Sequence, residues 1–135
     1  TVAEAAAATP TAALLDGKFD AAGEHVALLV SGGNVDLTEF GELTKLGLAS
    51  LDRYTHARLA LADWPEPVGR VTETVEHHGA ELDLLSPEPP TAELGANRRP
   101  VSIAIAGTGP EHLQAVLRSL DSEAGITVVS SELEA

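Results

Sequence analysis

The 135-residue sequence predicts an α+β fold with a ferredoxin-like βαββαβ domain over residues 51–135. Two observations predict it. In this part, short apolar runs suited to strands are interleaved with two amphipathic stretches that each begin at a proline and are followed by a glycine. Residues 1–50 instead follow a helix–strand–helix pattern around the letters SGGN. We therefore expect two parts, 1–50 and 51–135.

In the first part, the residue pattern changes from helical to strand-like and back to helical. Alanines favour a helix that is interrupted at Pro10, and a wholly apolar run before SGGN is typical of a strand buried on both faces of a parallel sheet. Asp36, with Glu39 three residues later, indicates a helix start. The expected elements are a helix over 3–15, a strand over 25–30 and a helix from 36 to about 50.

In the second part, stretches with strand character, apolar and partly alternating, take turns with stretches that have the apolar period of an amphipathic helix. The proline-rich stretch 86–97 is predicted as a loop. The expected elements are strands over 53–62, 80–85, 101–106 and 126–129, and helices over 67–78 and 110–123.

The composition is strongly acidic, with 21 Asp and Glu against 8 Lys and Arg and a net charge of −13. No basic face is available for phosphates, which disfavours nucleic acid and anionic membranes as partners. A dispersed acidic surface with two lysines suits concentrated salt, where screening is strong, so a halophilic cytoplasm is expected; an ordinary acidic protein is the alternative. Cysteine is absent, and no apolar run is long enough for a membrane span.

The segment Ser31, Gly32, Gly33 and Asn34 stands where the predicted strand ends and the next helix begins. Its hydroxyl and amide groups can cap that helix or contact a ligand, and its glycines let backbone approach a partner closely. Residue types alone leave open a plain strand-to-helix turn. The five histidines have no metal-ligand spacing, so no metal site is expected.

Several stretches together resemble a known family. ALLDGKFD, VALLVSGGNVD and a helix ending LGLASLDRY, followed by the βαββαβ half, resemble the C-terminal portion of threonine dehydratases (threonine ammonia-lyases) of the serine/threonine dehydratase family. The resemblance implies that residues 1–50 are a remnant of a fold type II pyridoxal-phosphate domain. It also implies that Ser31 bonds the cofactor's pyridine nitrogen, with Gly32, Gly33 and Asn34 completing the motif, and that residues 51–135 are an ACT-like regulatory domain.

The family's Schiff-base lysine lies upstream in a Ser-x-Lys context, and a glycine-rich loop holds the phosphate. Lys18 and Lys45 lack that context, and the loop is missing. We therefore expect this chain to be inactive and without a cofactor on its own, with pyridoxal phosphate and an upstream catalytic domain in the parent enzyme.

ACT-type sensors, by the same resemblance, bind amino acids at a D-x-P-G turn after the first strand. The turn here reads DWPEPVG, which makes Asp63, Trp64, Glu66 and Gly69 the candidate effector-binding residues. Glu66 replaces the expected glycine and would repel a carboxylate, so a structural or dimerising role stays open. Trp64 could stack on a ligand or cover an interface.

The predicted function is that of a regulatory and assembly region of an enzyme that deaminates threonine to 2-oxobutanoate, present as a homodimer or larger homo-oligomer. The alternative is a free-standing ACT-like module for amino-acid sensing or dimerisation.

Overall fold

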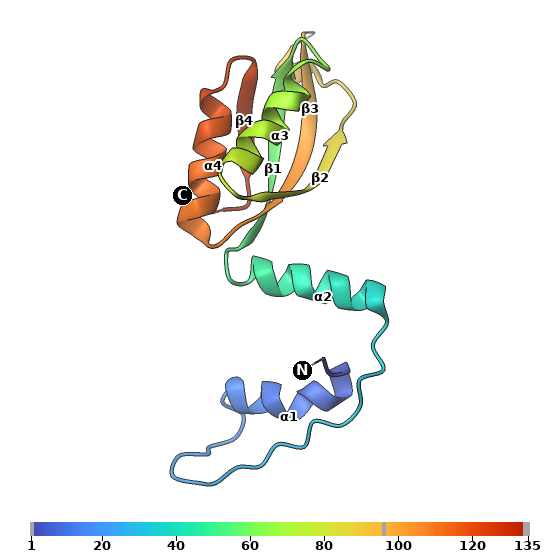
Figure 1. The fold of residues 1–135 in the computed structure, drawn as a ribbon, viewed down its shortest axis with the longest axis vertical. Helices are drawn as coiled ribbons and strands as arrows, with labels where there is room; N and C mark the ends of the chain where they lie inside the picture. The colour runs from blue at the N-terminus through green and yellow to red at the C-terminus, as the bar shows by residue number, and fades with distance from the viewer. Residues whose placement is uncertain (1, 96, 134–135) are drawn as a thin grey trace. The chain divides into compact units, whose positions relative to one another are not determined.

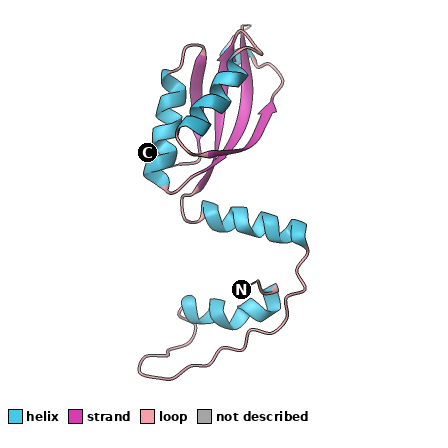
Figure 2. Cartoon of the chain, in the orientation of Figure 1, coloured by secondary structure: helices cyan, strands magenta, loops and turns pink. Residues whose placement is uncertain are grey.

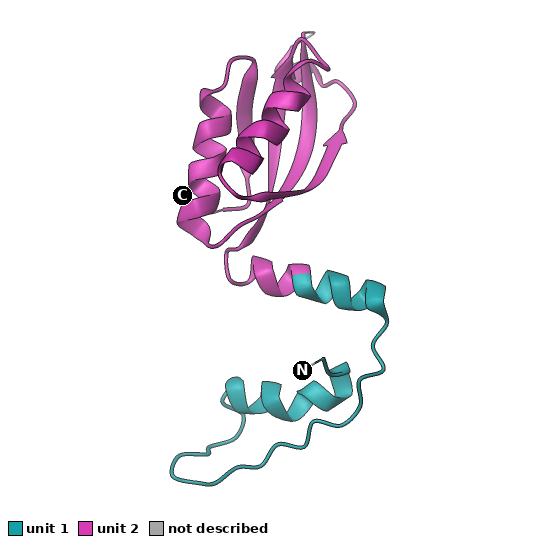
Figure 3. Cartoon of the chain, viewed as in Figure 1, with its two compact units in different colours: residues 1–44 teal, residues 45–135 magenta. Residues whose placement is uncertain are grey.

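The computed structural model describes residues 2–95 and 97–133, and the chain divides into two compact units (Figure 3). The N-terminal unit is residues 1–44 and the C-terminal unit is residues 45–135; the boundary falls within helix α2 (Leu37–Ala49).

The C-terminal unit is built on a four-stranded sheet with the order β2-β3-β1-β4, and every neighbouring pair is antiparallel (Figure 1). Between strands the chain forms two long helices and a short 3₁₀ turn, η1. The elements are β1 (Tyr54–Ala62), α3 (Pro67–His77), β2 (Glu81–Pro87), η1 (Ala92–Leu94), β3 (Arg98–Ala106), α4 (Pro110–Ser122) and β4 (Ile126–Ser131). This order confirms the predicted α+β class and is compatible with a ferredoxin-like fold.

Helices α3 and α4 cover one face of the sheet (Figure 2). Alternate residues of the central strands, such as Leu59 and Ile103, turn toward them and are fully buried. Val71 of α3 and Leu113 of α4 close the core from the helical side. Side chains on one face recur every second residue in a strand and about every 3.6 residues in a helix. The apolar residues at these positions therefore meet in one layer between the sheet and the two helices.

Charged side chains link the strands on the other face of the sheet. The Glu88 carboxylate accepts hydrogen bonds from Arg58 Nε at 2.9 Å and from the Ser102 hydroxyl, and pairs with Arg58 Nη2 at 2.8 Å. These donors, Ser102 first, lower the pKa of Glu88. Residues far apart in sequence are therefore joined across β1 and β3.

A second ionic group contains Asp83, which accepts from Lys45 at 2.8 Å and from the Tyr54 hydroxyl at 2.6 Å. The lysine and the phenol, in that order, lower the pKa of Asp83. Lys45 thereby ties the last turns of α2 to the sheet within the C-terminal unit.

The N-terminal unit holds α1 (Ala5–Leu15) and the first part of α2, and it corrects two predictions. Helix α1 runs through Pro10 without a break, because proline removes one donor while the flanking alanines still favour helix. Residues 25–30 form no strand; they are exposed, and none of the strands in the described part of the chain pairs with their backbone groups. The helix predicted from residue 36 is confirmed as α2.

Candidate functional site

The end of β1 and the start of β3 meet at one edge of the sheet, because Ala62 pairs with Arg98. Asp63 and Trp64 leave β1 there, and Asp63 has the left-handed φ of 54° that turns the chain toward α3. The Trp64–Pro65 peptide bond is cis. A cavity of about 320 Å³ opens at this point, lined by Asp63, Trp64, Pro90, Asn97, Arg98 and Arg99. We call it the β1–β3 pocket.

Two adjacent arginines give the β1–β3 pocket its positive charge. The guanidinium carbon of Arg99 lies 5.9 Å from the centre of the Trp64 ring, within cation–π range. Arg99 Nε is buried and has no hydrogen-bond partner among the described atoms. Arg98 Nη1 donates to the Thr127 hydroxyl at 2.6 Å. Neither arginine forms an ion pair with a carboxylate of the described residues, Asp63 included.

Two of the four effector residues predicted from sequence line this pocket, and two do not. Asp63 and Trp64 line it. Glu66 is the N-cap residue of α3, and its carboxylate accepts from Arg70 Nη2 at 2.8 Å, so it is paired with a cation one turn into that helix. Gly69 lies in α3, where an added Cβ would meet nothing within 4 Å. Neither residue lines the β1–β3 pocket.

Sequence reasoning missed Arg98, Arg99, Asn97 and Pro90. Arg98 and Arg99 reach the turn after β1 only through the β1–β3 register, which joins positions far apart in the chain, and Pro90 and Asn97 precede β3. One local signal was available: an Arg-Arg pair beside a proline-rich loop in a chain with 8 basic residues.

The SGGN segment lies in the N-terminal unit as exposed, irregular backbone. Gly32 has a left-handed φ of 87°, and a Cβ there would lie 2.5 Å from Glu4 Oε1. Helix α2 starts three residues after Asn34, capped by Asp36. Asp36 Oδ1 accepts from the backbone N–H groups of Glu39 and Thr38, and these bonds, Glu39 first, lower the pKa of Asp36. Asp36, rather than the SGGN segment, caps the helix.

The residues present do not make up a pyridoxal phosphate site. Ser31, Gly32 and Gly33 line none of the cavities described, and Asn34 lines one of about 250 Å³ between α1 and the start of α2. Glu4 and Glu39 also line that cavity, and their carboxylates would repel a phosphate. The SGGN segment can therefore supply at most one wall of a larger site.

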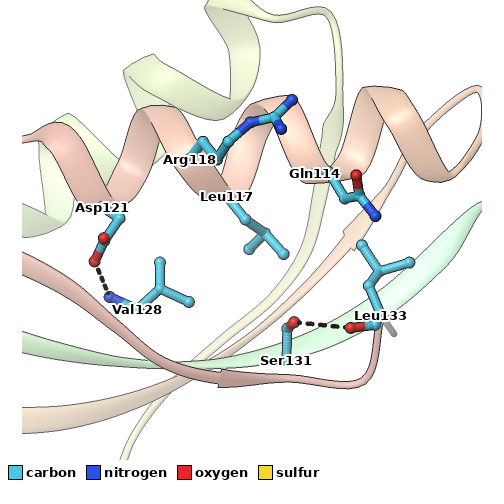
Figure 4. A pocket seen from close by; sticks show the side chains of 7 residues that line it. All are labelled: Gln114, Leu117, Arg118, Asp121, Val128, Ser131 and Leu133. Carbon is cyan, nitrogen blue, oxygen red and sulfur yellow. Dashed lines mark hydrogen bonds between the residues drawn. The ribbon is translucent and has the colours of Figure 1, made fainter. Parts of the chain in front are cut away.

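A third concave feature is the groove between α4 and β4, with a volume of about 510 Å³ (Figure 4). Leu117, Val128 and Leu133 form its apolar floor. Asp121 at its rim accepts from the Val128 backbone N–H at 2.8 Å. The Ser131 hydroxyl of this groove donates to the Leu133 carbonyl at 3.5 Å, so it is not shown hydrogen-bonded to a general base that could activate it as a nucleophile.

Within residues 2–95 and 97–133, no three His, Cys, Asp or Glu side chains are grouped to hold a metal ion. None of the helices in that same part of the chain has the length and apolar character needed to cross a membrane.

Fold and pocket together define a small α+β unit with a cavity lined by acidic and basic side chains. Comparison with known proteins adds the relatives. The chain is 30% identical over 118 residues to the L-threonine ammonia-lyase of Geobacter sulfurreducens. The aligned stretch covers 87% of this chain and 29% of that protein. It is 48% identical over 54 residues to the catabolic L-threonine dehydratase of Staphylococcus aureus strain N315. This shorter aligned stretch covers 38% of this chain and 16% of that protein.

These comparisons confirm the resemblance: the chain is similar in sequence to threonine ammonia-lyases, also called threonine dehydratases, over most of its length. The match spans less than a third of the Geobacter protein. No protein-family model matches the sequence.

Proposed function

We propose that this chain is the C-terminal regulatory and assembly region of an enzyme that deaminates threonine to 2-oxobutanoate. Residues 51–135 would be an ACT-like domain that binds an amino-acid effector, and residues 1–50 would complete a catalytic domain. The similarity to the Geobacter ammonia-lyase supports both halves. It covers 118 of the 135 residues, so the unmatched remainder is smaller than either compact unit, and the matched stretch must include part of each.

The observation that carries this proposal is the contrast between the two units. The C-terminal unit has a complete core, whereas Ala7 is the one buried residue of the described N-terminal unit. Ten of the fifteen large exposed apolar side chains lie in that smaller unit, Leu29 being 80% exposed. Surfaces of this kind are normally covered by a partner. The rest of a catalytic domain is the partner that the similarity supports.

A place in such a domain also accounts for the run at 25–30. An apolar run of this length is suited to a strand between two neighbours in a parallel sheet, and those neighbours would come from the upstream catalytic domain. In the assembled enzyme, Ser31, Gly32, Gly33 and Asn34 would follow that strand at its carboxyl end, where α/β proteins place their ligands. The pyridoxal phosphate implied by the relatives would be held there, with its lysine and phosphate loop supplied from outside this chain.

The regulatory part of the proposal is supported by strand order and by the β1–β3 pocket. The order β2-β3-β1-β4 is compatible with the ferredoxin-like arrangement of ACT domains. The pocket lies directly after β1, at the turn singled out from the sequence. A ligand there can change activity only if it binds one state of the enzyme more tightly than another.

The test uses threonine deamination, followed as 2-oxobutanoate formation. The chain alone with added pyridoxal phosphate is expected to be inactive, and the enzyme that carries it is expected to be active and to respond to added isoleucine, valine, threonine or serine. Activity from the chain alone would refute the proposed role.

A second candidate, a free-standing sensor or dimerisation module, is favoured by the self-contained core of the C-terminal unit. Light scattering across a concentration series is expected to report a homodimer or larger assembly in either case. An enzyme that is active but indifferent to every amino acid tested would favour the purely assembling role.

A further inference from the structure

We propose that Lys45, Tyr54 and Asp83 form a latch that holds the last turns of α2 against the sheet, and that the opening of this latch releases them. We call these three residues the α2 latch. All three lie in the C-terminal unit, so the latch belongs to that unit alone. That its opening affects catalysis rests on the proposed function, because the residues that precede α2 would then belong to a catalytic domain.

The first argument is that packing does not hold α2 in place. None of its 13 residues is buried, and Leu46 is 66% exposed. Lys45 and Leu48 are half-buried and lie three residues apart, so they share one face, the face from which Lys45 reaches β2. A helix of this length is marginal in water without support from other elements. The polar contacts of that face therefore decide whether the last turns of α2 stay formed.

The second argument is that three elements meet at one oxygen atom of the latch. Asp83 Oδ2 accepts from Lys45 Nζ of α2 at 2.8 Å and from the Tyr54 hydroxyl of β1 at 2.6 Å. Both contacts are strengthened by the charge of the carboxylate. Helix α2, strand β1 and strand β2 are thereby joined at a single point.

The third argument is that an irregularity in β2 aims Asp83 at its partners. Leu82 pairs with Ile105 and Leu84 pairs with Ala104, which are neighbouring positions of β3. Asp83 is therefore the extra residue of a β-bulge, a feature that re-aims a side chain away from regular alternation. β2 is also an edge strand with β3 as its one neighbour in the sheet, so it shifts more easily than the central strands.

The fourth argument is that the latch is weak enough to open while the chain beyond it stays attached. The side chains of Lys45 and Asp83 are 41% and 30% exposed, and ion pairs with this access to water contribute little net stability. Backbone bonds fix the chain just after the helix. The Leu48 carbonyl accepts from the Arg53 N–H, and the Arg53 carbonyl accepts from the Gly107 N–H, both at 2.8 Å. Opening the latch therefore frees the last turns of α2 and leaves their far end anchored.

Helix α2 passes this change along because it is one continuous element. It runs from Leu37 to Ala49, and its capping residue Asp36 stands two residues after Asn34 of the SGGN segment. Helix formation is cooperative, so disorder in the last turns lowers the stability of the turns before them. A closed latch supports the helix that begins beside the SGGN segment, and an open latch withdraws that support.

Amide hydrogen exchange of the 135-residue chain tests the latch. Asp83→Asn and Lys45→Gln are each expected to speed exchange at residues 45–49 at least fivefold. The double variant is expected to stay within twofold of the faster single variant, because both substitutions remove the same contact. Lys45→Arg keeps the charge and is expected to stay within twofold of the wild type. The matched control is Lys18→Gln, which removes a lysine paired with Asp16 at 3.3 Å in the N-terminal unit and should leave these amides within twofold.

The amides of β1 and β3 report whether a variant is folded. If a variant loses protection there, Tyr54→Phe replaces it, because this substitution removes one hydrogen bond without altering charge; it is expected to speed exchange at residues 45–49 at least twofold. The inference is overturned if the single variants leave exchange unchanged or if Lys18→Gln acts as strongly as Asp83→Asn. It is also overturned if these amides exchange without protection in the wild type.

A second measurement links the latch to catalysis. In the enzyme that carries this chain, the threonine deamination rate is measured with and without isoleucine, valine or serine. The ratio of the two rates is expected to change at least threefold with Asp83→Asn and less than twofold with Lys18→Gln. An unaltered ratio combined with accelerated exchange would refute the coupling to catalysis and leave the latch standing. An enzyme that does not deaminate threonine would refute the proposed function instead, whatever the exchange result.

Discussion

Gly107 begins the turn between β3 and α4, and replacing it with alanine tests the packing of this junction most sharply. An added Cβ would lie 2.7 Å from Leu113 Cδ2, 2.9 Å from His112 Nδ1 and 3.1 Å from Leu113 Cγ. Leu113 is fully buried in the core. His112 is held on both sides, by the Thr108 N–H at 3.1 Å and by the His78 carbonyl at 2.8 Å. Neither side chain can move aside without breaking an existing contact.

Overpacking of this kind costs about 1–3 kcal/mol, against a gain of about 0.4–1 kcal/mol from the stiffer unfolded chain. We therefore expect Gly107→Ala to lower the free energy of unfolding by about 1–2 kcal/mol. Urea unfolding followed by circular dichroism gives this value, provided that the m-value is unchanged.

Gly109→Ala, two residues away, is the matched control. A Cβ at Gly109 meets nothing within 4 Å, and its φ of 162° is extended backbone that any residue adopts. We expect this control to stay within about 0.5 kcal/mol of the wild type, because the small loss at the helix N-cap offsets the entropic gain. Equal effects of the two substitutions would refute the packing described for the junction.

Three further predictions concern charge. The lowered pKa of Glu88 means that its stabilisation is complete above its ordinary value of 4.5 and is lost as the pH falls through the lower folded-state value. Acid unfolding of Glu88→Gln should therefore show a flatter dependence on pH below about 4.5 than the wild type, and an identical slope would contradict the role given to Arg58 and Ser102. Asp36→Ala should reduce the helical circular dichroism of α2, since two backbone donors lose their acceptor, whereas Asp36→Asn should retain most of it. Finally, raising KCl from dilute buffer to molar concentration should increase the midpoint of thermal unfolding, because screening relieves repulsion within a chain of charge −13; full stability in dilute buffer would favour an ordinary acidic protein.

The second half of the chain was predictable because its signals are local. Alternation in residues 53–62 and the helix starts at Pro67 and Pro110 depend on neighbouring residues, and the structure places β1, α3 and α4 there. β3 begins at Arg98, three residues before the predicted strand. Its first residues are polar and include Pro100, and they are held as a strand by pairing with β1, which sequence periodicity does not reveal.

The first half was less predictable, because its local composition and its structure disagree. The run at 25–30 has the composition of a buried strand, but a strand needs adjacent backbone, and none of the strands in residues 2–95 and 97–133 pairs with it. The candidate pocket shows a related limit. Asp63 and Trp64 followed from a turn motif, whereas Arg98 and Arg99 join them through the β1–β3 register alone.

The central proposal is that the C-terminal unit senses a small molecule on behalf of a threonine-deaminating catalyst. The most direct measurement is the threonine deamination rate of the enzyme that carries this chain, titrated with isoleucine, valine and serine in turn while the fluorescence of Trp64, the single tryptophan of this chain, is recorded. The account predicts a rate that changes with half-saturation at the concentration that half-saturates the fluorescence. A rate that stays constant across that range would contradict it.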